Sequence, residues 1–278
     1  TLGRGGSDTT AVALAAALGA DVCEIYTDVD GIFTTDPRIV PLARKIDSIT
    51  AEEMLELAAS GAKVLHLRAV EYARRHGVVL HVRSSFSNEQ GTIVYDPAKG
   101  HPKGEQVEEP VITGIAAEKS EAKITVGGVP DVPGKAAEIF EIVAKTHANI
   151  DMIVQNVSAA NTNRTDISFT VPLGEGRRVI EALEGERESL EFESLQYDDQ
   201  IAKVAVVGAG MRTSTGVSAK LFRTLFEADI NIEMISTSEI RISVVTRADL
   251  MDKAVRVLHT AFGLDADTEA TIYAGTGR

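Results

Sequence analysis

The chain has 278 residues, of which 44% are hydrophobic, and it carries a formal net charge of −13. This length suffices for roughly two or three ordinary domains, and the negative charge argues against a nucleic acid or an acidic membrane surface as a partner. The single cysteine, Cys23, excludes a disulfide framework and is expected to be a small core residue. No apolar run approaches the ~20 residues that a membrane helix needs, and no secretory signal is present. We therefore expect a cytoplasmic protein.

The first hundred residues alternate predicted helices and strands, which indicates a layered α/β segment. Residues 8–18 predict a helix that is small or apolar on every side, and such a helix is expected to be buried. Thr50 begins another predicted helix, because Glu53 three residues later completes a capping box. The remaining predicted elements are a strand over residues 21–26, a helix over 64–76 and a short buried strand over 78–82.

Residues 96–110 change the character of the chain, because they are polar and rich in proline and glycine. Such a stretch is typical of a linker. We place the first domain at residues 1–100 on this basis. Two further domains are expected at residues 101–199 and 200–278.

The two later domains are copies of one module. A constant offset of 82 residues over several matched positions indicates a duplication. Each copy predicts the βαββαβ order of a ferredoxin-like unit, and the last strand of the second copy is expected over residues 269–273. The matched positions are Gly128, Gly134, Ala137, Phe140, Asn149, Ile150, Met152 and Ile153, which recur as Gly210, Gly216, Ala219, Phe222, Asn231, Ile232, Met234 and Ile235.

A glycine-rich loop, Gly3 to Asp8, precedes the first predicted helix. Glycines let the backbone come close to a ligand, and the N-terminus of the following helix favours an anion. Arg4 could bind a carboxylate or phosphate through two parallel hydrogen bonds, and Asp8 could anchor an ammonium group. The spacing matches neither the Rossmann fingerprint nor the P-loop. The alternative is a glycine-rich connection with a salt bridge.

An acidic stretch at residues 26–38 follows the first predicted strand and contains three aspartates. The calcium-binding EF-hand frame fails, because Gly31 follows only two acids and no glutamate ends the loop. The stretch is either a nucleotide site, with Phe33 against the base and Arg38 on phosphate, or an acidic loop with a proline turn. Lys63 follows a glycine between two helices, although a lone lysine usually faces solvent. The histidines show no metal-ligand spacing, so no metal ligand is assigned.

Each copy of the duplicated module carries the same pair of charge-binding features. A glycine, Gly134 or Gly216, stands at a helix N-terminus, where free N–H groups can bind a carboxylate. An asparagine and an acid, within 149–151 or 231–233, could hold an ammonium group. An amino acid carries both charges, so the pattern favours an amino-acid ligand. The alternative is that the glycine only starts a helix and the asparagine only makes a turn.

Several strings resemble the aspartate kinase (aspartokinase) family, namely residues 1–11, 27–31 and 35–38, while 155–158 and 236–239 are similar to its paired ACT regulatory domains. The resemblance covers the whole chain and is strongest to the lysine- and threonine-regulated type. It implies the C-terminal part of an amino-acid-kinase domain followed by two ferredoxin-like ACT domains. It also implies transfer of the ATP γ-phosphoryl group to L-aspartate, giving 4-phospho-L-aspartate on the route to lysine, threonine and methionine.

The resemblance assigns expected roles to particular residues. Asp8 matches the catalytic acidic position, and L-aspartate is expected at Arg4, Gly5, Gly6 and Ser7. ATP, which carries Mg²⁺ with it, is expected at Thr27, Asp28, Phe33, Thr34, Thr35, Asp36, Pro37, Arg38 and Lys63. The effectors L-lysine and/or L-threonine are expected at Asp131, Gly134, Asn149, Ile150, Asp151, Gln155, Asn231, Ile232, Ser236, Thr237, Ser238, Ser243 and Val244.

The resemblance also bears on assembly. In the family, ACT units pair between chains, so a homo- or hetero-oligomer of aspartokinase subunits is expected. One unit can be inserted into the other, which makes the boundary near residue 200 approximate.

One departure from the family pattern bears on activity. The family has a Lys-Phe-Gly-Gly segment well before the glycine loop, and no lysine precedes Arg4 here. We therefore expect the 278 residues alone not to phosphorylate aspartate. The alternatives are a non-catalytic amino-acid-sensing subunit, although such a short form is not expected to keep the glycine loop, and an unrelated α/β enzyme with ferredoxin-like appendages.

Overall fold

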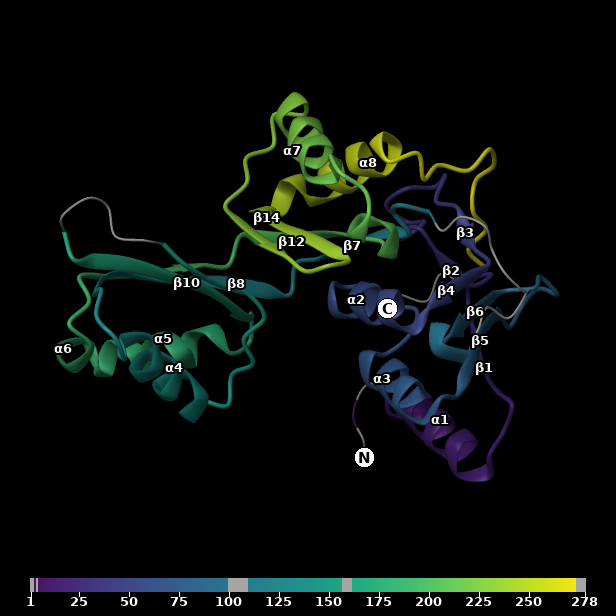
Figure 1. Cartoon of the computed structure of the whole chain (residues 1–278), viewed down its shortest axis with the longest axis horizontal. Helices are drawn as coiled ribbons and strands as arrows, with labels where there is room; N and C mark the ends of the chain where they lie inside the picture. The colour runs from purple at the N-terminus through teal and green to yellow at the C-terminus, as the bar shows by residue number, and fades with distance from the viewer. Residues whose placement is uncertain (1–2, 4, 100–109, 157–161, 274–278) are drawn as a thin grey trace.

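The structure is a computed structural model that describes residues 3, 5–99, 110–156 and 162–273. These residues form three layered units arranged in a row (Figure 1). We call residues 3–99 the front segment. Unit 1 is the sheet and helices of residues 121–198, and unit 2 consists of residues 114–118 together with residues 201–264. Unit 2 lies between the other two (Figure 1).

The front segment is built on a four-stranded mixed sheet in the order β1-β5-β6-β4. Strands β1 and β5 are parallel, and β5 and β6 are antiparallel. The strands are β1 (Val22–Thr27), β4 (Ser48–Thr50), β5 (Val79–Ser84) and β6 (Thr92–Tyr95), with a small hairpin of β2 (Ile32–Phe33) and β3 (Lys45–Ile46) beside them. The helices are α1 (Gly6–Leu18), α2 (Ala51–Ala59), α3 (Leu67–His76) and the short η1 (Pro97–Lys99). The predicted layered α/β segment is confirmed.

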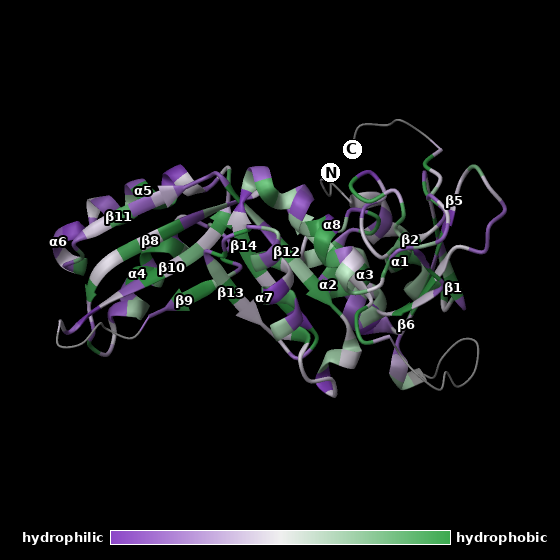
Figure 2. Ribbon diagram, turned by 90° about the horizontal axis from the view of Figure 1, so that it is seen from above, coloured by the Kyte–Doolittle hydropathy of each residue, from purple (hydrophilic) through white to green (hydrophobic). Residues whose placement is uncertain are grey.

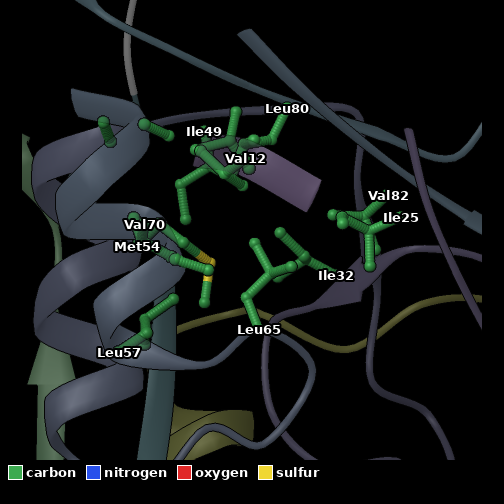
Figure 3. Close-up of a cluster of buried hydrophobic side chains, with 14 of the residues drawn as sticks. Val12, Ile25, Ile32, Ile49, Met54, Leu57, Leu65, Val70, Leu80 and Val82 are labelled. Atoms are coloured by element: carbon green, nitrogen blue, oxygen red, sulfur yellow. The ribbon is translucent and has the colours of Figure 1, made fainter. Parts of the chain in front are cut away.

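The core of the front segment joins these helices to the sheet (Figure 3). Val12 from α1, Met54 from α2 and Leu80 from β5 are completely buried. The capping box predicted at Thr50 and Glu53 forms, with the Thr50 hydroxyl accepting from the Glu53 N–H at 3.2 Å. Cys23 is buried in the same core, as expected.

Helix α1 differs from its prediction. It was expected to be buried on every side, but only Val12 and Ala15 are buried, while Leu14 is 57% and Leu18 is 74% exposed. The reason is geometric: within the described residues α1 packs on α3 and β1, which cover one of its faces. An apolar composition around the whole helix therefore does not by itself fix which faces are covered.

Unit 1 has the expected ferredoxin-like order within one continuous stretch. Its sheet runs β11-β8-β10-β9, with antiparallel neighbours throughout. Helices α4 and α5 pack on one face of this sheet (Figure 1). Figure 2 shows hydrophobic residues along β8 and β10 and hydrophilic ones on the outer side of α5 and α6. The elements are β8 (Glu121–Pro130), α4 (Lys135–Lys145), β9 (Ile153–Gln155), β10 (Arg164–Pro172), α5 (Gly176–Gly185), α6 (Arg187–Leu190) and β11 (Ser194–Asp198).

Unit 2 has the same sheet order but assembles it from two separate stretches of chain. Its sheet runs β13-β14-β12-β7, and β7 (Gly114–Glu118) precedes unit 1 in the sequence. Unit 1 is thus inserted between the fourth strand of unit 2 and the other three. The remaining elements are β12 (Ile201–Val207), η2 (Ala209–Arg212), α7 (Val217–Glu227), β13 (Met234–Thr237), β14 (Arg241–Arg247), η3 (Ala248–Leu250) and α8 (Met251–Ala261).

The last strand predicted for the second copy, residues 269–273, is wrong because β7 already occupies that position beside β12. The chain after α8 instead returns to the front segment. Ala43 forms an isolated bridge with Asp265, and Val29 forms one with Ile272. The segment of residues 264–273, which we call the C-terminal strap, therefore lies along the acidic stretch of the front segment.

Candidate functional site

The glycine loop ends at the start of α1, as predicted. Gly5 is the N-cap residue in a left-handed conformation (φ 74°), and no side chain among the described residues caps the helix. The first N–H groups of α1 consequently lack a side-chain acceptor and can bind an anion. Ser7 donates to Asp8 at 3.3 Å, and both lie in the first turn with Gly6. Arg4 falls outside the described residues.

His66 is a neighbour of the glycine loop that the sequence did not reveal. A Cβ atom added at Gly5 would overlap the His66 ring, so a residue larger than glycine does not fit there without movement. His66 is the N-cap of α3, and its Nδ1 is buried without a hydrogen-bond partner among the described residues. Lys63, in the same connection, has an exposed side chain. The α2–α3 connection therefore lies directly against the loop expected to bind aspartate.

The acidic stretch after β1 is cross-linked into one compact loop. Arg38 donates to the Asp28 carboxylate at 3.3 Å and lies 3.7 Å from Asp36. Asp36 in turn accepts from the backbone N–H of Arg38 at 2.9 Å, and Thr27 donates to Asp28 at 3.1 Å. The structure thus brings together four of the residues expected for ATP. The Arg38 side chain stays 46% exposed and keeps donors free for a phosphate.

Other residues of the same stretch turn inward. Thr34 and Thr35 are 2% and 7% exposed, Pro37 is buried and Phe33 is half-buried. Thr34 makes its side-chain hydrogen bond to His259 of unit 2, not to an open site. The Thr34 side chain therefore holds the loop, the Thr35 side chain is buried, and the backbone and the exposed residues are what a ligand can reach.

The C-terminal strap lies against the acidic stretch. The N–H of Tyr273 donates to the carbonyl of Asp28 at 3.1 Å, and the Tyr273 hydroxyl donates to Asp30 at 3.1 Å. The ring of Tyr273 stacks on Phe86 with 6.1 Å between centroids. Earlier in the strap, Ala270 donates to the carbonyl of Pro41 at 2.8 Å. The chain leaving unit 2 is thus part of the structure around the loop expected to bind ATP.

A pocket of about 320 Å³ opens at the N-terminus of α4 in unit 1. Three residues expected to bind an effector line it, namely Asp131, Gly134 and Gln155. Gly134 is the left-handed N-cap of α4 (φ 103°), and within the described part of the chain no side chain caps this helix. The pocket therefore combines free helix N–H groups, which favour a carboxylate, with the acid Asp131, which favours an ammonium group.

The other expected effector residues of unit 1 have partners elsewhere. The N–H of Asn149 donates to Glu175 at 3.1 Å, and Ile150 packs on the core of the unit. Asp151 accepts from Lys203 of unit 2 at 2.6 Å. The structure does not bring these three residues into the pocket at α4.

Asp151 belongs to a reciprocal arrangement across the seam between the two units. Lys203 of unit 2 is 1% exposed and also contacts Glu118 at 2.7 Å and Glu121 at 2.9 Å. These carboxylates raise the pKa of Lys203 although burial lowers it, so the ammonium group stays charged. In the opposite direction, Lys123 of unit 1 pairs with Glu233 of unit 2, the residue that repeats Asp151.

The expected effector residues of unit 2 are divided between its core and its surface. Ile232 and Val244 pack in the core, and Ser243 is completely buried with no hydrogen-bond partner for its hydroxyl among the described residues. Asn231 accepts from Thr246 at 2.9 Å through its carbonyl. Ser236 on β13 lies opposite Ser243 on β14 and is half-buried, while Thr237 and Ser238 are exposed.

Two features of the described residues concern metal binding and membrane insertion. Among them, no group of three or more His, Cys, Asp and Glu side chains is placed to hold a metal ion. Within the same residues, every helix is too short or too polar to cross a membrane.

Comparison with known proteins defines the class. The amino acid kinase family matches residues 1–84, and the ACT domain matches residues 124–186 and 204–262. The chain is thus an amino-acid-kinase segment joined to two ACT domains.

Relatives narrow the class further. The aspartokinase of Mycobacterium tuberculosis is 58% identical over 278 residues, which are 100% of this chain and 65% of that protein. The regulatory subunit of aspartate kinase from Thermus thermophilus is 38% identical, with a TM-score of 0.51, over 55% of this chain and 99% of that one. The chain belongs to the aspartokinase family.

A solved structure of a whole member is also similar. Escherichia coli aspartokinase III with aspartate and ADP, in the R-state, has a TM-score of 0.78 and 29% identity over 94% of this chain and 56% of that one. The same enzyme with lysine and aspartate, in the T-state, has a TM-score of 0.71 and 30% identity. The chain spans about two thirds of the length of the curated relatives that it matches.

Proposed function

We propose that the chain acts as part of an aspartate kinase, which transfers the γ-phosphoryl group of ATP to the side-chain carboxylate of L-aspartate. The product is 4-phospho-L-aspartate, at the first step toward lysine, threonine and methionine. The observation that carries the proposal is the uncapped N-terminus of α1 behind Gly5, with Asp8 in its first turn. An anion-binding helix end beside an acidic residue suits a substrate with both carboxylate and ammonium groups.

The residues have distinct roles in this proposal. Arg4, Gly5, Gly6 and Ser7 bind aspartate, because a guanidinium and backbone N–H groups hold carboxylates in fixed orientations. Asp8 organises the charged groups around the transferring phosphoryl group. Phosphoryl transfer depends on positioning and charge neutralisation more than on covalent chemistry by the protein.

ATP binds along the acidic stretch and Lys63 in this proposal. Arg38 is held in place by Asp28 and Asp36, so little side-chain entropy is lost when it contacts a phosphate. Mg²⁺ bound with ATP neutralises phosphate charge.

Feedback regulation by lysine and/or threonine completes the proposal. The pocket at α4 offers a carboxylate site at the helix N-terminus and an ammonium site at Asp131. The T-state structure of E. coli aspartokinase III in complex with lysine and aspartate supports an amino-acid effector for the family. We further propose that the protein is cytoplasmic and forms homo- or hetero-oligomers through its ACT domains.

An alternative is a non-catalytic, amino-acid-sensing subunit. It is favoured by the match to the T. thermophilus regulatory subunit, which covers 99% of that chain. Such a subunit accounts for 55% of this chain, and this chain also carries the amino acid kinase match at residues 1–84. This favours the kinase over the regulatory subunit.

Thermal unfolding of the chain with each ligand tests the binding assignments. L-threonine or L-lysine at ~100 times its Kd should add about 2.7 kcal/mol of stability, which is a shift of a few degrees for a chain near this size. Gln155→Leu, in the pocket, should abolish the shift, while Gln196→Leu on the exposed part of β11 should retain it. No shift with either amino acid would remove the support for an effector pocket.

Activity is tested separately by trapping the acyl phosphate with hydroxylamine in the presence of Mg-ATP and L-aspartate. We expect the 278 residues assayed by themselves to give no product, because no lysine precedes Arg4 to meet the phosphates. Robust turnover by this polypeptide would contradict that expectation and confirm the kinase assignment directly.

A further inference from the structure

Thr34, in the stretch expected to bind ATP, is held by unit 2 through its side chain. Its Oγ1 lies 2.8 Å from Nε2 of His259 on α8, and the two residues are 2% and 0% exposed. On the other side of the ring, Nδ1 of His259 lies 2.7 Å from Oδ1 of Asp265. The three side chains form a chain of hydrogen bonds from the C-terminal strap, through α8, to residues 27–38, which we call the nucleotide loop because they are expected to bind ATP.

The directions of these hydrogen bonds follow from the chemistry of the groups. An ionised Asp265 only accepts, so Nδ1 of His259 carries the proton and donates to it. Burial lowers the pKa of His259, although Asp265 raises it, and the ring is therefore neutral with Nε2 as an acceptor. The Thr34 hydroxyl donates to Nε2 and accepts from the N–H of Arg44 at 3.0 Å. Both ring nitrogens of His259 and the Thr34 hydroxyl thus have specific partners.

The backbone of Thr34 is held by unit 2 as well. Its carbonyl accepts from the N–H of Ile115 on β7 at 2.7 Å, while its N–H donates to the carbonyl of Arg44 at 2.9 Å. Space is short at this point, because a Cβ atom added at Gly114 would lie 2.9 Å from the Thr34 carbonyl oxygen. Thr34 is thus fixed by the fourth strand of unit 2 and by its last helix at once.

A purely structural role explains these contacts less well than a positioning role. The buried neighbours of His259 on α8 are apolar, namely Ala254, Val255 and Leu258, and a leucine would bury more apolar surface there without the desolvation cost of an imidazole. What the imidazole adds is a directional bond that fixes the orientation of Thr34. That orientation sets the path of the chain between Phe33 and Arg38.

We propose that His259 is a positioning residue for ATP, because it holds Thr34 and thereby the nucleotide loop in the conformation that presents Arg38. Unit 2 is then mechanically joined to the nucleotide site, and a shift of α8 or β7 changes the loop directly. This inference rests on the proposed function, since it takes residues 27–38 as the nucleotide loop. Hydrogen exchange and nucleotide binding test the two parts separately.

The first measurement is amide hydrogen exchange of peptides covering residues 33–44 in the 278-residue chain. His259→Phe removes the acceptor at 2.8 Å and leaves the buried Thr34 hydroxyl only the Leu264 carbonyl at 3.5 Å, so we expect exchange in this loop to accelerate by about tenfold or more. Thr260→Val, at an exposed position on the same helix, is the matched control and should leave exchange unchanged. Unchanged exchange of the loop in folded His259→Phe would overturn the proposal.

Asp265→Ala provides a second variant in case His259→Phe does not fold. Asp265 has 29% side-chain exposure, so its removal frees the His259 ring without opening a core cavity. The loop should again exchange faster, by about fivefold, because the ring loses one orienting hydrogen bond. His259→Gln, which can still accept from Thr34, should restore protection partly. Equal loop exchange in Asp265→Ala and the unchanged chain would also overturn the proposal.

The second measurement is titration of the same proteins with a fluorescent ATP analogue and Mg²⁺. We expect the Kd of His259→Phe to rise about tenfold, with no rise in Thr260→Val. Unchanged affinity together with faster loop exchange would overturn the positioning role. If the unchanged chain binds no nucleotide, the assignment of the nucleotide loop fails, while the exchange measurement still decides whether His259 holds it.

Discussion

The two ACT units have the same sheet order but differ in how they are joined to the rest of the molecule. Unit 1 takes all four strands from one stretch, residues 121–198, whereas unit 2 takes its fourth strand, β7, from before that stretch. The face of the unit 2 sheet that α7 and α8 leave free packs on α2, with Ala116 and Val207 in the core of the front segment. Unit 2 is therefore structurally part of the kinase segment, and unit 1 is an addition to it.

The two seams also differ in chemistry. Between unit 2 and α2, Glu53 is 6% exposed and accepts from the Thr113 hydroxyl at 2.6 Å and the Ala209 N–H at 3.0 Å. Between units 1 and 2, the apolar part is small and the lysine–carboxylate pairs dominate. The seam of unit 2 is thus held mainly by packing and by the hydrogen bonds of Glu53, and the seam of unit 1 mainly by charge.

The largest effect is expected at the seam of unit 1. Lys203→Met removes a buried ammonium group and leaves three carboxylates close together, so it should lower the free energy of unfolding by about 3–5 kcal/mol. Urea unfolding measures the loss, with Lys145→Met on the exposed side of α4 as control. A loss no larger than that of the control would mean that the seam is not held by Lys203.

A smaller effect is expected at the seam of unit 2. One carboxylate oxygen of Glu53 accepts from Thr113 and Ala209, and the other accepts from the N–H and the hydroxyl of Thr50. Glu53→Gln replaces one of these oxygens with an NH₂ group that faces two donors, so it should lower the free energy of unfolding by about 2 kcal/mol. Glu52→Gln, one residue away and half exposed, should cost less than about 0.5 kcal/mol. Equal costs would show that the buried position of Glu53 adds nothing to its hydrogen bonds.

Acid should lower the stability of the protein through protonation of His259 in unit 2. Its pKa in the folded protein is lowered from 6.5, so the unfolded chain binds more protons as the pH falls through 6.5. Stability is then present above that pH and lost below it, by about 1 kcal/mol for each pH unit. Thermal unfolding at pH 7.5 and 5.5 measures the change, which should be smaller in His259→Gln. The charged neighbours Asp265 and Arg44 remain in both proteins.

The smallest effect is expected at the second ion pair of the unit 1 seam. Lys123 and Glu233 are 21% and 16% exposed, so Lys123→Met should cost about 1 kcal/mol, well below Lys203→Met. The comparison uses the same urea unfolding. If the two losses were equal, the reciprocal pairs would be energetically equivalent and burial would not distinguish them.

The sequence predicted what local patterns and repetition determine. The duplicated module, the capping box at Thr50 and the glycines at the N-termini of α4 and α7 all follow from short stretches, and the structure confirms them. The pairing of β7 with β12 was beyond reach, because five residues favour a strand without specifying its partner. The Thr34–His259 bond joins residues 225 positions apart, and no local pattern indicates it.

Charge chemistry was the other limit of the sequence. An acid beside Asn149 or Asn231 is compatible with a ligand ammonium group, but the structure pairs Asp151 and Glu233 with lysines of the neighbouring unit. A ligand ammonium group and a lysine of the neighbouring unit neutralise the charge of the acid equally well. Only the positions of Lys123 and Lys203, near the starts of β8 and β12, which contact each other across the seam, decide between them.

The position of β7 has a consequence for how the chain is made. A ribosome completes β7 before unit 1 and before β12, so this strand leaves the exit tunnel long before its partner exists. Unit 1 contains all of its own strands and can fold in that interval, while β7 waits with an unpaired edge. Expression at a temperature or rate that delays β12 should therefore expose this edge longest, and aggregation during synthesis is expected to begin there.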